Sequence, residues 1–90
     1  MVQIEFRPSH EECIETLARR EYERSLRGCL ASEKVGSELV EKMELLRLFL
    51  QSADFRRLRA ESEGWLSRGK GVKFVLSLED GKLKTELVVL

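Results

Sequence analysis

Apolar and polar residues alternate in three stretches of the chain, which is the pattern of half-buried β-strands. The first stretch covers residues 2–6, near the N-terminus. The other two cover residues 72–78 and 83–89. Between them lies Asp80-Gly81, a pair typical of a two-residue hairpin turn, because both central residues of that turn need positive φ. We therefore predict one N-terminal strand and a C-terminal β-hairpin.

The hairpin has a register that follows from its turn. A two-residue loop predicts that Glu79 pairs with Lys82, Leu78 with Leu83, Leu76 with Thr85 and Phe74 with Leu87. Apolar residues then share one face of the sheet, and a charged pair lies on the other face. Turn chemistry and hydrophobic pattern thus predict the same hairpin.

Apolar residues between the strands recur at helical spacing. One stripe extends from Ile14 to Leu30. Ser9 and Glu12 precede it with the S-x-x-E spacing of a capping box. We expect this first helix to start at Ser9 and to end between Ala31 and Val35.

A second helix is predicted from Ser37 onward. Its apolar face changes side near residues 52–54, where Ser52 and Asp54 are both good helix-capping residues. We therefore expect a kink or break there, followed by a short third helix to about Glu63. The glycine-rich segment 64–71 is then a loop.

These elements predict an α+β fold in the order β-α-α-β-β. A three-stranded, mainly antiparallel sheet has a helical hairpin packed on one face and its other face in solvent. Residues 72–78 form the most apolar strand, so we expect them at the centre, although a full reversal near residue 53 leaves strand order open. The expected core comprises Ile4, Phe6, Leu17, Tyr22, Leu26, Met43, Leu46, Leu50, Phe74, Leu76, Leu78 and Leu87.

Length and composition indicate one small globular domain over residues 1–90. Hydrophobic residues make up 42% of the chain and charged residues 36%, so a core is feasible despite the high charge. The net charge is zero, which gives no general attraction to nucleic acid or to an anionic membrane. Asparagine is absent and Gln3 and Gln51 are the only glutamines, a composition found in thermophile proteins.

The N-terminus lacks the basic start and apolar run of a signal peptide, and no apolar run is long enough to span a bilayer. Cys13 and Cys29 are too few for a disulfide framework and form no CxxC pair. These observations predict a cytoplasmic protein without a membrane anchor.

The segment PSHEEC contains the chain's only histidine and is the strongest candidate for chemistry. His10 and Cys13 have i, i+3 spacing, but a metal site needs three or four protein ligands. Cys29 points about 160° away from Cys13 on the same helix and cannot complete one. A Cys–His nucleophile is the alternative, although the glutamates at 11, 12 and 15 would oppose a thiolate. We expect a capped helix start, with no catalytic residue, metal or cofactor.

A run of basic residues is the main candidate for binding nucleic acid. It comprises Arg56, Arg57, Arg59, Arg68, Lys70, Lys73, Lys82 and Lys84. Phosphate backbones bind such clusters when they form one surface. Stacking aromatics are missing, however, and segment SRGKG lacks the spacing of a phosphate-binding loop. We interpret the run chiefly as a solvated face.

Apolar residues surround most of the second helix, and one sheet face cannot cover them all. A first helix of about 22 residues would also overhang the strands by about 10 Å. We therefore predict a homodimer through Val40, Leu45, Leu48 and Phe49. The alternative is a monomer in which the third helix folds back over the same residues. The functional hypotheses are, in order, a non-catalytic interaction module, a nucleic-acid-binding accessory protein and an enzyme.

Overall fold

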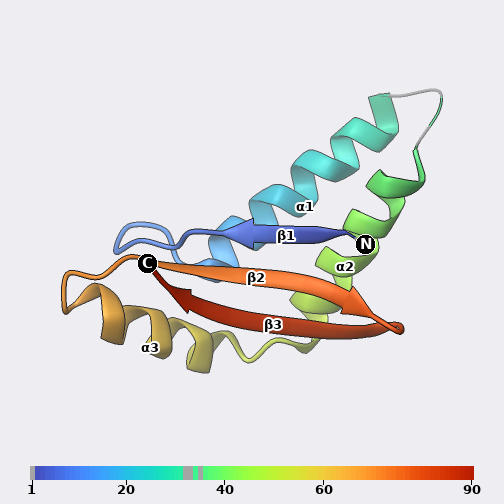
Figure 1. Cartoon of the computed structure of the whole chain (residues 1–90). Coiled ribbons are helices and arrows are strands. Elements are labelled where there is room, and N and C mark those ends of the chain that lie inside the picture. The colour runs from blue at the N-terminus through green and yellow to red at the C-terminus, as the bar shows by residue number, and fades with distance from the viewer. Residues whose placement is uncertain (1, 32–33, 35) are drawn as a thin grey trace.

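The computed structural model describes residues 2–31, 34 and 36–90, and they form an α+β fold with one antiparallel sheet (Figure 1). In chain order the elements are β1 (Gln3–Phe6), α1 (Ile14–Ala31), α2 (Ser37–Ser52), α3 (Phe55–Leu66), β2 (Val72–Glu79) and β3 (Lys82–Val89). The predicted α+β class is confirmed. The predicted end of the first helix, between Ala31 and Val35, lies partly outside the described residues.

The sheet has the order β1-β2-β3, with β2 at the centre and both pairings antiparallel. The hairpin register is the predicted one: Leu78 pairs with Leu83 and Phe74 with Leu87. Asp80 and Gly81 have φ of 52° and 76°, the positive values that a type I′ turn requires. The hairpin prediction is therefore confirmed residue by residue.

The helical region breaks completely between α2 and α3. Ala53 is extended, with ψ of 138°, and its N–H still donates to the Phe49 carbonyl at 2.9 Å. Asp54 caps α3 by accepting the Arg57 N–H at 3.2 Å. Phe55 then packs edge-on against Phe49, with ring centroids 5.3 Å apart. The aromatic pair ties the start of α3 to the end of α2.

Two predicted helix boundaries were wrong. The chain from Ser9 forms a closed turn, in which the Ser9 N–H donates to the Glu12 carbonyl, and α1 starts only at Ile14. At the other end of the helical region, α3 continues through Trp65 to Leu66 instead of ending near residue 63. Gly69, at φ of 78°, provides the left-handed conformation that closes the end of α3.

The core lies between the sheet and the helices. Its members are Ile4, Phe6, Ile14, Ala18, Leu45, Leu46, Phe49, Leu58, Phe74 and Leu76. Most predicted core residues are buried or packed against this cluster, but Leu26 is 39% exposed and its prediction was wrong. Leu26 lies about 100° around α1 from Ser25, which is buried, so its side chain faces away from the helix contact.

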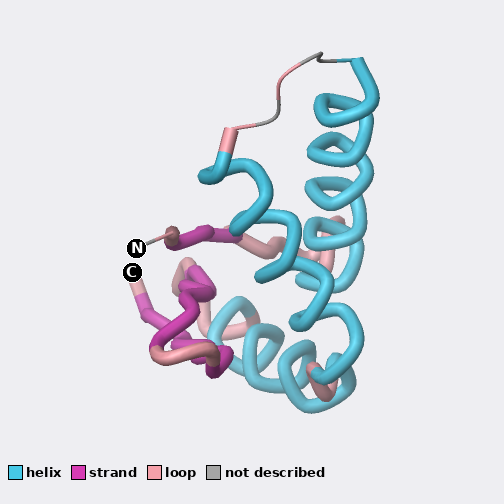
Figure 2. The backbone as a smooth tube through the Cα atoms, turned by 90° about the vertical axis from the view of Figure 1, so that its right-hand side faces the viewer, coloured by secondary structure: helices cyan, strands magenta, loops and turns pink. Residues whose placement is uncertain are grey.

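The sheet forms one layer and the helices lie on one side of it (Figure 2). The hairpin of α1 and α2 crosses the strands obliquely, so that its tip projects beyond β1 (Figure 1). The molecule is accordingly elongated, with extents of 46 × 28 × 22 Å. The overhang was predicted from a first helix longer than the strands. However, α1 has 18 residues and the long strands have eight, so the helix and the strands are of nearly equal length. The crossing angle of the hairpin, and not a length difference, produces the projection.

Candidate functional site

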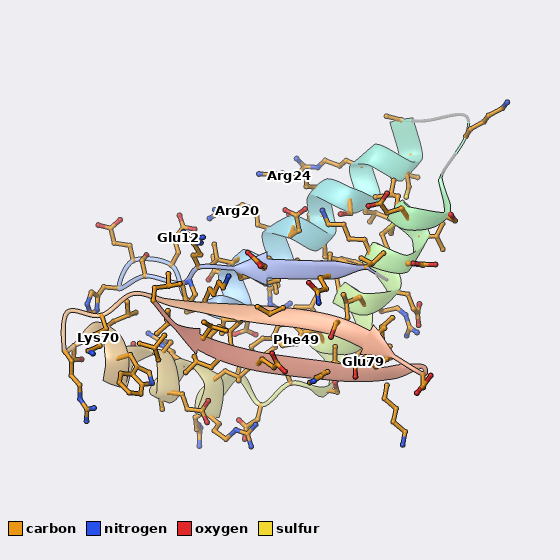
Figure 3. All side chains as sticks on the ribbon, in the orientation of Figure 1. Glu12, Arg20, Arg24, Phe49, Lys70 and Glu79 are labelled. Atoms are coloured by element: carbon orange, nitrogen blue, oxygen red, sulfur yellow. The ribbon has the colours of Figure 1, made fainter. Side chains whose placement is uncertain are left out.

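The turn before α1 satisfies only half of the predicted capping box. Ser9 Oγ accepts the Glu12 N–H at 3.2 Å, as the motif requires. The Glu12 carboxylate instead accepts a hydrogen bond from Arg20 at 2.8 Å (Figure 3). The turn places Cys13 immediately before the first helical residue, and the Cys13 carbonyl accepts the Leu17 N–H at 3.1 Å.

Cys13 thereby occupies a position that favours its thiolate. The hydroxyl of Thr16, 3.3 Å from Cys13 Sγ, is the main cause of a lowered thiol pKa. The backbone N–H of Thr16 lowers this pKa further, burial raises it slightly, and the Glu15 N–H and the Arg59 charge lower it again. Neighbouring glutamates were expected to oppose the thiolate, yet the hydrogen bonds from Thr16 leave the thiol pKa lowered.

Two adjoining hollows lie between the start of α1 and α3, and Cys13 lines both. The first, of about 370 Å³, is lined by Cys13, Ile14, Glu15, Phe55, Arg56, Arg59, Ala60 and Glu63. The second, of about 240 Å³, is lined by Ser9, His10, Glu11, Cys13, Thr16, Arg59, Ser62 and Glu63. Sequence reasoning identified His10 and Cys13 but missed Arg59 here, because only the folding back of α3 brings that arginine to α1.

The side chains that line these hollows bind other residues of the chain, and these contacts limit the chemistry that the hollows can support. The Arg59 guanidinium donates to Glu63 at 3.3 Å. The side-chain partner of Cys13 is Thr16, not His10, so the base that nucleophilic catalysis needs is not in place. Within the described ranges, no group of three His, Cys, Asp or Glu residues is arranged to hold a metal ion. The geometry thus places a thiol of lowered pKa beside two hollows, with Thr16 as its side-chain partner.

The predicted basic residues do not form one surface. Lys73, Lys82 and Lys84 lie on the outer face of the sheet, whereas Arg56, Arg57 and Arg59 belong to α3, on the helix side. Lys70 lies at the opposite end of the sheet from Glu79, the pairing partner of Lys82 (Figure 3).

Carboxylates also neutralise several of these basic residues. Arg57 contacts Glu61 at 3.7 Å and Lys73 contacts Glu5 at 3.4 Å. Lys84 contacts Glu86 at 3.0 Å. The contiguous positive surface required for binding a phosphate backbone is therefore not present among the described residues.

The predicted self-association residues are divided between core and surface. Leu45 and Phe49 have no exposed surface and belong to the core cluster, so their assignment to an intermolecular face was wrong. Leu48 is half-buried and Val40 is 54% exposed. The sheet and α3 thus cover the part of α2 that follows Glu44, and exposed apolar surface remains nearer the hairpin tip.

Three large apolar side chains on the hairpin are exposed, and we call Leu26, Leu30 and Val40 the hairpin strip. Leu30 is 80% exposed. The helices meet beside it, where Cys29 Sγ lies 3.0 Å from Met43 Sδ. At about 100° per residue, all three strip residues face the side of the hairpin opposite Glu21 and Lys42. Leu26 and Leu30 lie about 140° and 180° around α1 from Glu21, and Val40 lies about 160° around α2 from Lys42. This side of the hairpin is the side away from β1, because Glu21 and Lys42, joined at 2.5 Å, lie on the β1 side.

These features define a small α+β domain with a projecting helical hairpin. A protein-family model matches residues 2–89, and the chain belongs to that family, which is uncharacterised. No curated protein and no solved structure matches the chain. Among the described residues, no helix is both long enough and apolar enough to cross a membrane.

Proposed function

We propose that this domain is a non-catalytic interaction module that self-associates as a homodimer through the hairpin strip. The exposure of Leu26, Leu30 and Val40, at 39%, 80% and 54%, is the observation that carries the proposal. Apolar clusters on a projecting element are uncommon on monomers and mark association surfaces. The reactive thiol and the divided basic residues provide no comparable support for catalysis or nucleic-acid binding.

The surface area supports a second copy as the occupant. The chain exposes 6221 Å², whereas a compact monomer of 10.4 kDa exposes about 5,400 Å². The difference, about 800 Å², reflects the elongated shape and leaves surface enough for one side of a standard interface. The radius of gyration agrees, at 13.8 Å against about 12 Å for a compact chain of this length.

A two-fold axis beside the hairpin tip would bring the two strips together. The same patch then meets itself, which is the usual geometry of a homodimer. The α1 and α2 helices of both copies would pack as a four-helix arrangement around Leu30 and Val40. We also place the protein in the cytoplasm, since Cys13 and Cys29 are both free thiols; fractionation of the source cells checks this.

Sedimentation of matched variants tests the proposed interface. L30Q/V40Q makes the strip polar at two exposed helix positions. R27Q/E41Q changes two exposed charged residues beside the strip and leaves its apolar side chains in place. We expect L30Q/V40Q to weaken self-association at least about tenfold, by removing apolar area from the interface. R27Q/E41Q should sediment like the unmodified chain, and circular dichroism should show that both variants are folded. If L30Q/V40Q associates as tightly as R27Q/E41Q, the strip is not the interface.

A further inference from the structure

Strand β3 forms a free edge of the sheet. The strand order β1-β2-β3 gives β3 a single strand neighbour, and Figure 1 shows β3 as the outermost strand. In Figure 2, α3 lies on the same side of the strands as the other helices, so it does not continue the sheet. An edge of eight residues presents a row of backbone groups that another strand can pair with.

The turn determines which backbone groups of β3 point outward. In a hairpin with a two-residue loop, Glu79 and Lys82 form a hydrogen-bonded pair, and bonded and non-bonded pairs then alternate. Lys84 and Glu86 therefore direct their N–H and C=O groups toward β2. Leu83, Thr85 and Leu87 direct theirs away from the sheet, along the free edge.

The charge pattern of β3 is complementary to itself. We propose that β3 pairs antiparallel with β3 of a second copy, about a two-fold axis at Thr85. Lys84 of each copy then lies opposite Glu86 of the other, and Leu83 lies opposite Leu87. The two nearest alternatives that keep the same face would centre on Lys84 or on Glu86. The first places Lys84 opposite Lys84, although Lys82 then lies opposite Glu86, and the second places Glu86 opposite Glu86; the register through Thr85 is the one of the three without a like-charge pair.

The pairing centred on Thr85 also fits the groove that lies next to the free edge of β3. A groove of about 290 Å³ lies on the helix side of the sheet, lined by Phe49, Ser52, Ala53, Asp54, Arg57, Leu58, Leu83 and Thr85. Leu87 of the second copy, opposite Leu83, would lie over this groove on the same face. Pairing through Thr85 preserves the alternation of faces, so the joined sheet has six strands with all helices on one side.

The β3 edge lies apart from the hairpin strip, so this inference goes beyond the proposed function. Each interface closes on its own two-fold axis, and together they would link chains into assemblies larger than a dimer. The two interfaces can therefore be tested separately, by examining the edge in the L30Q/V40Q chain. That chain is expected to retain a dimer formed by β3 alone.

Charge reversal at two positions of β3 tests the pairing in the L30Q/V40Q chain. K84E alone places two glutamates opposite two glutamates, and E86K alone places lysines opposite lysines. We expect each variant alone to self-associate at least about tenfold more weakly than its parent. An equimolar mixture should recover a dimer with one copy of each, detected by native mass spectrometry with one of the two variants labelled with ¹⁵N so that the chain masses differ. Because the contact between Lys84 and Glu86 within each chain is broken in both variants, recovery on mixing can come only from contacts between chains.

A proline variant tests the backbone pairing directly. T85P removes an N–H that the monomer does not use, so the hairpin should keep its circular dichroism while the β3 dimer is lost. An L30Q/V40Q chain that is monomeric at high micromolar concentration overturns the β3 proposal and leaves the hairpin interface untouched. Charge variants that fail to recover a dimer on mixing overturn it as well. A mass unaffected by L30Q/V40Q instead counts against the proposed function alone.

Discussion

Replacement of Leu76 by alanine tests the assignment of the buried sheet face. Leu76 has no exposed surface and lies on the central strand, opposite Ile4 of β1 and Thr85 of β3. Removing three carbons at about 0.8 kcal/mol each costs about 2.4 kcal/mol. The ladders on both sides restrain collapse around the site, so a cavity term adds to this, and we expect a total loss of about 3–5 kcal/mol.

Urea unfolding followed by circular dichroism measures this loss. Val75→Ala is the matched control, because Val75 is half-buried on the opposite face of the same strand; it should cost less than about 1.5 kcal/mol. Both variants are compared at one protein concentration, since self-association stabilises the folded chain by mass action. A loss below about 1 kcal/mol for Leu76→Ala would refute the assignment of the buried face.

Two further predictions concern helix starts. Asp54→Ala removes the side chain that caps α3 and should lower the free energy of unfolding by about 0.5–2 kcal/mol in the same assay, and an unchanged value would mean that the cap does not hold the break. In a C29A chain, alkylation of Cys13 should show its pH midpoint below that of a free cysteine, because the thiolate persists to lower pH when the thiol pKa is lowered. T16V should raise that midpoint, and a midpoint insensitive to T16V would exclude the Thr16 hydroxyl as its main cause.

The hairpin could be predicted in full because its information is local. Asp80-Gly81 determines the turn, the turn determines the register, and the register agrees with the alternation of apolar residues. An interruption of the helix near residues 52–54 could also be predicted, since the apolar face changes side there, but a kink and a full break could not be told apart. What the sequence could not determine was the direction of α3 after the break, which depends on the packing of Phe55 against Phe49.

The errors in the candidate surfaces have the same origin. Leu45 and Phe49 were expected at an interface because helix periodicity cannot show which sides of α2 the rest of the fold covers. Arg59 was assigned to a basic run, whereas folding brings it to the hollows beside Cys13. Leu26 fits the helical stripe, yet it is 39% exposed, because it lies about 100° around α1 from the buried Ser25. Each error depends on contacts between segments that are distant in the chain.

Self-association is the central claim, and sedimentation equilibrium of the unmodified chain tests it most directly. The measurement spans low to high micromolar protein, so that a reversible equilibrium is visible as a rise in average mass. We predict an average mass that rises with concentration to at least twice the 10.4 kDa of one chain. A single 10.4 kDa species at every concentration would contradict both the hairpin interface and the β3 pairing.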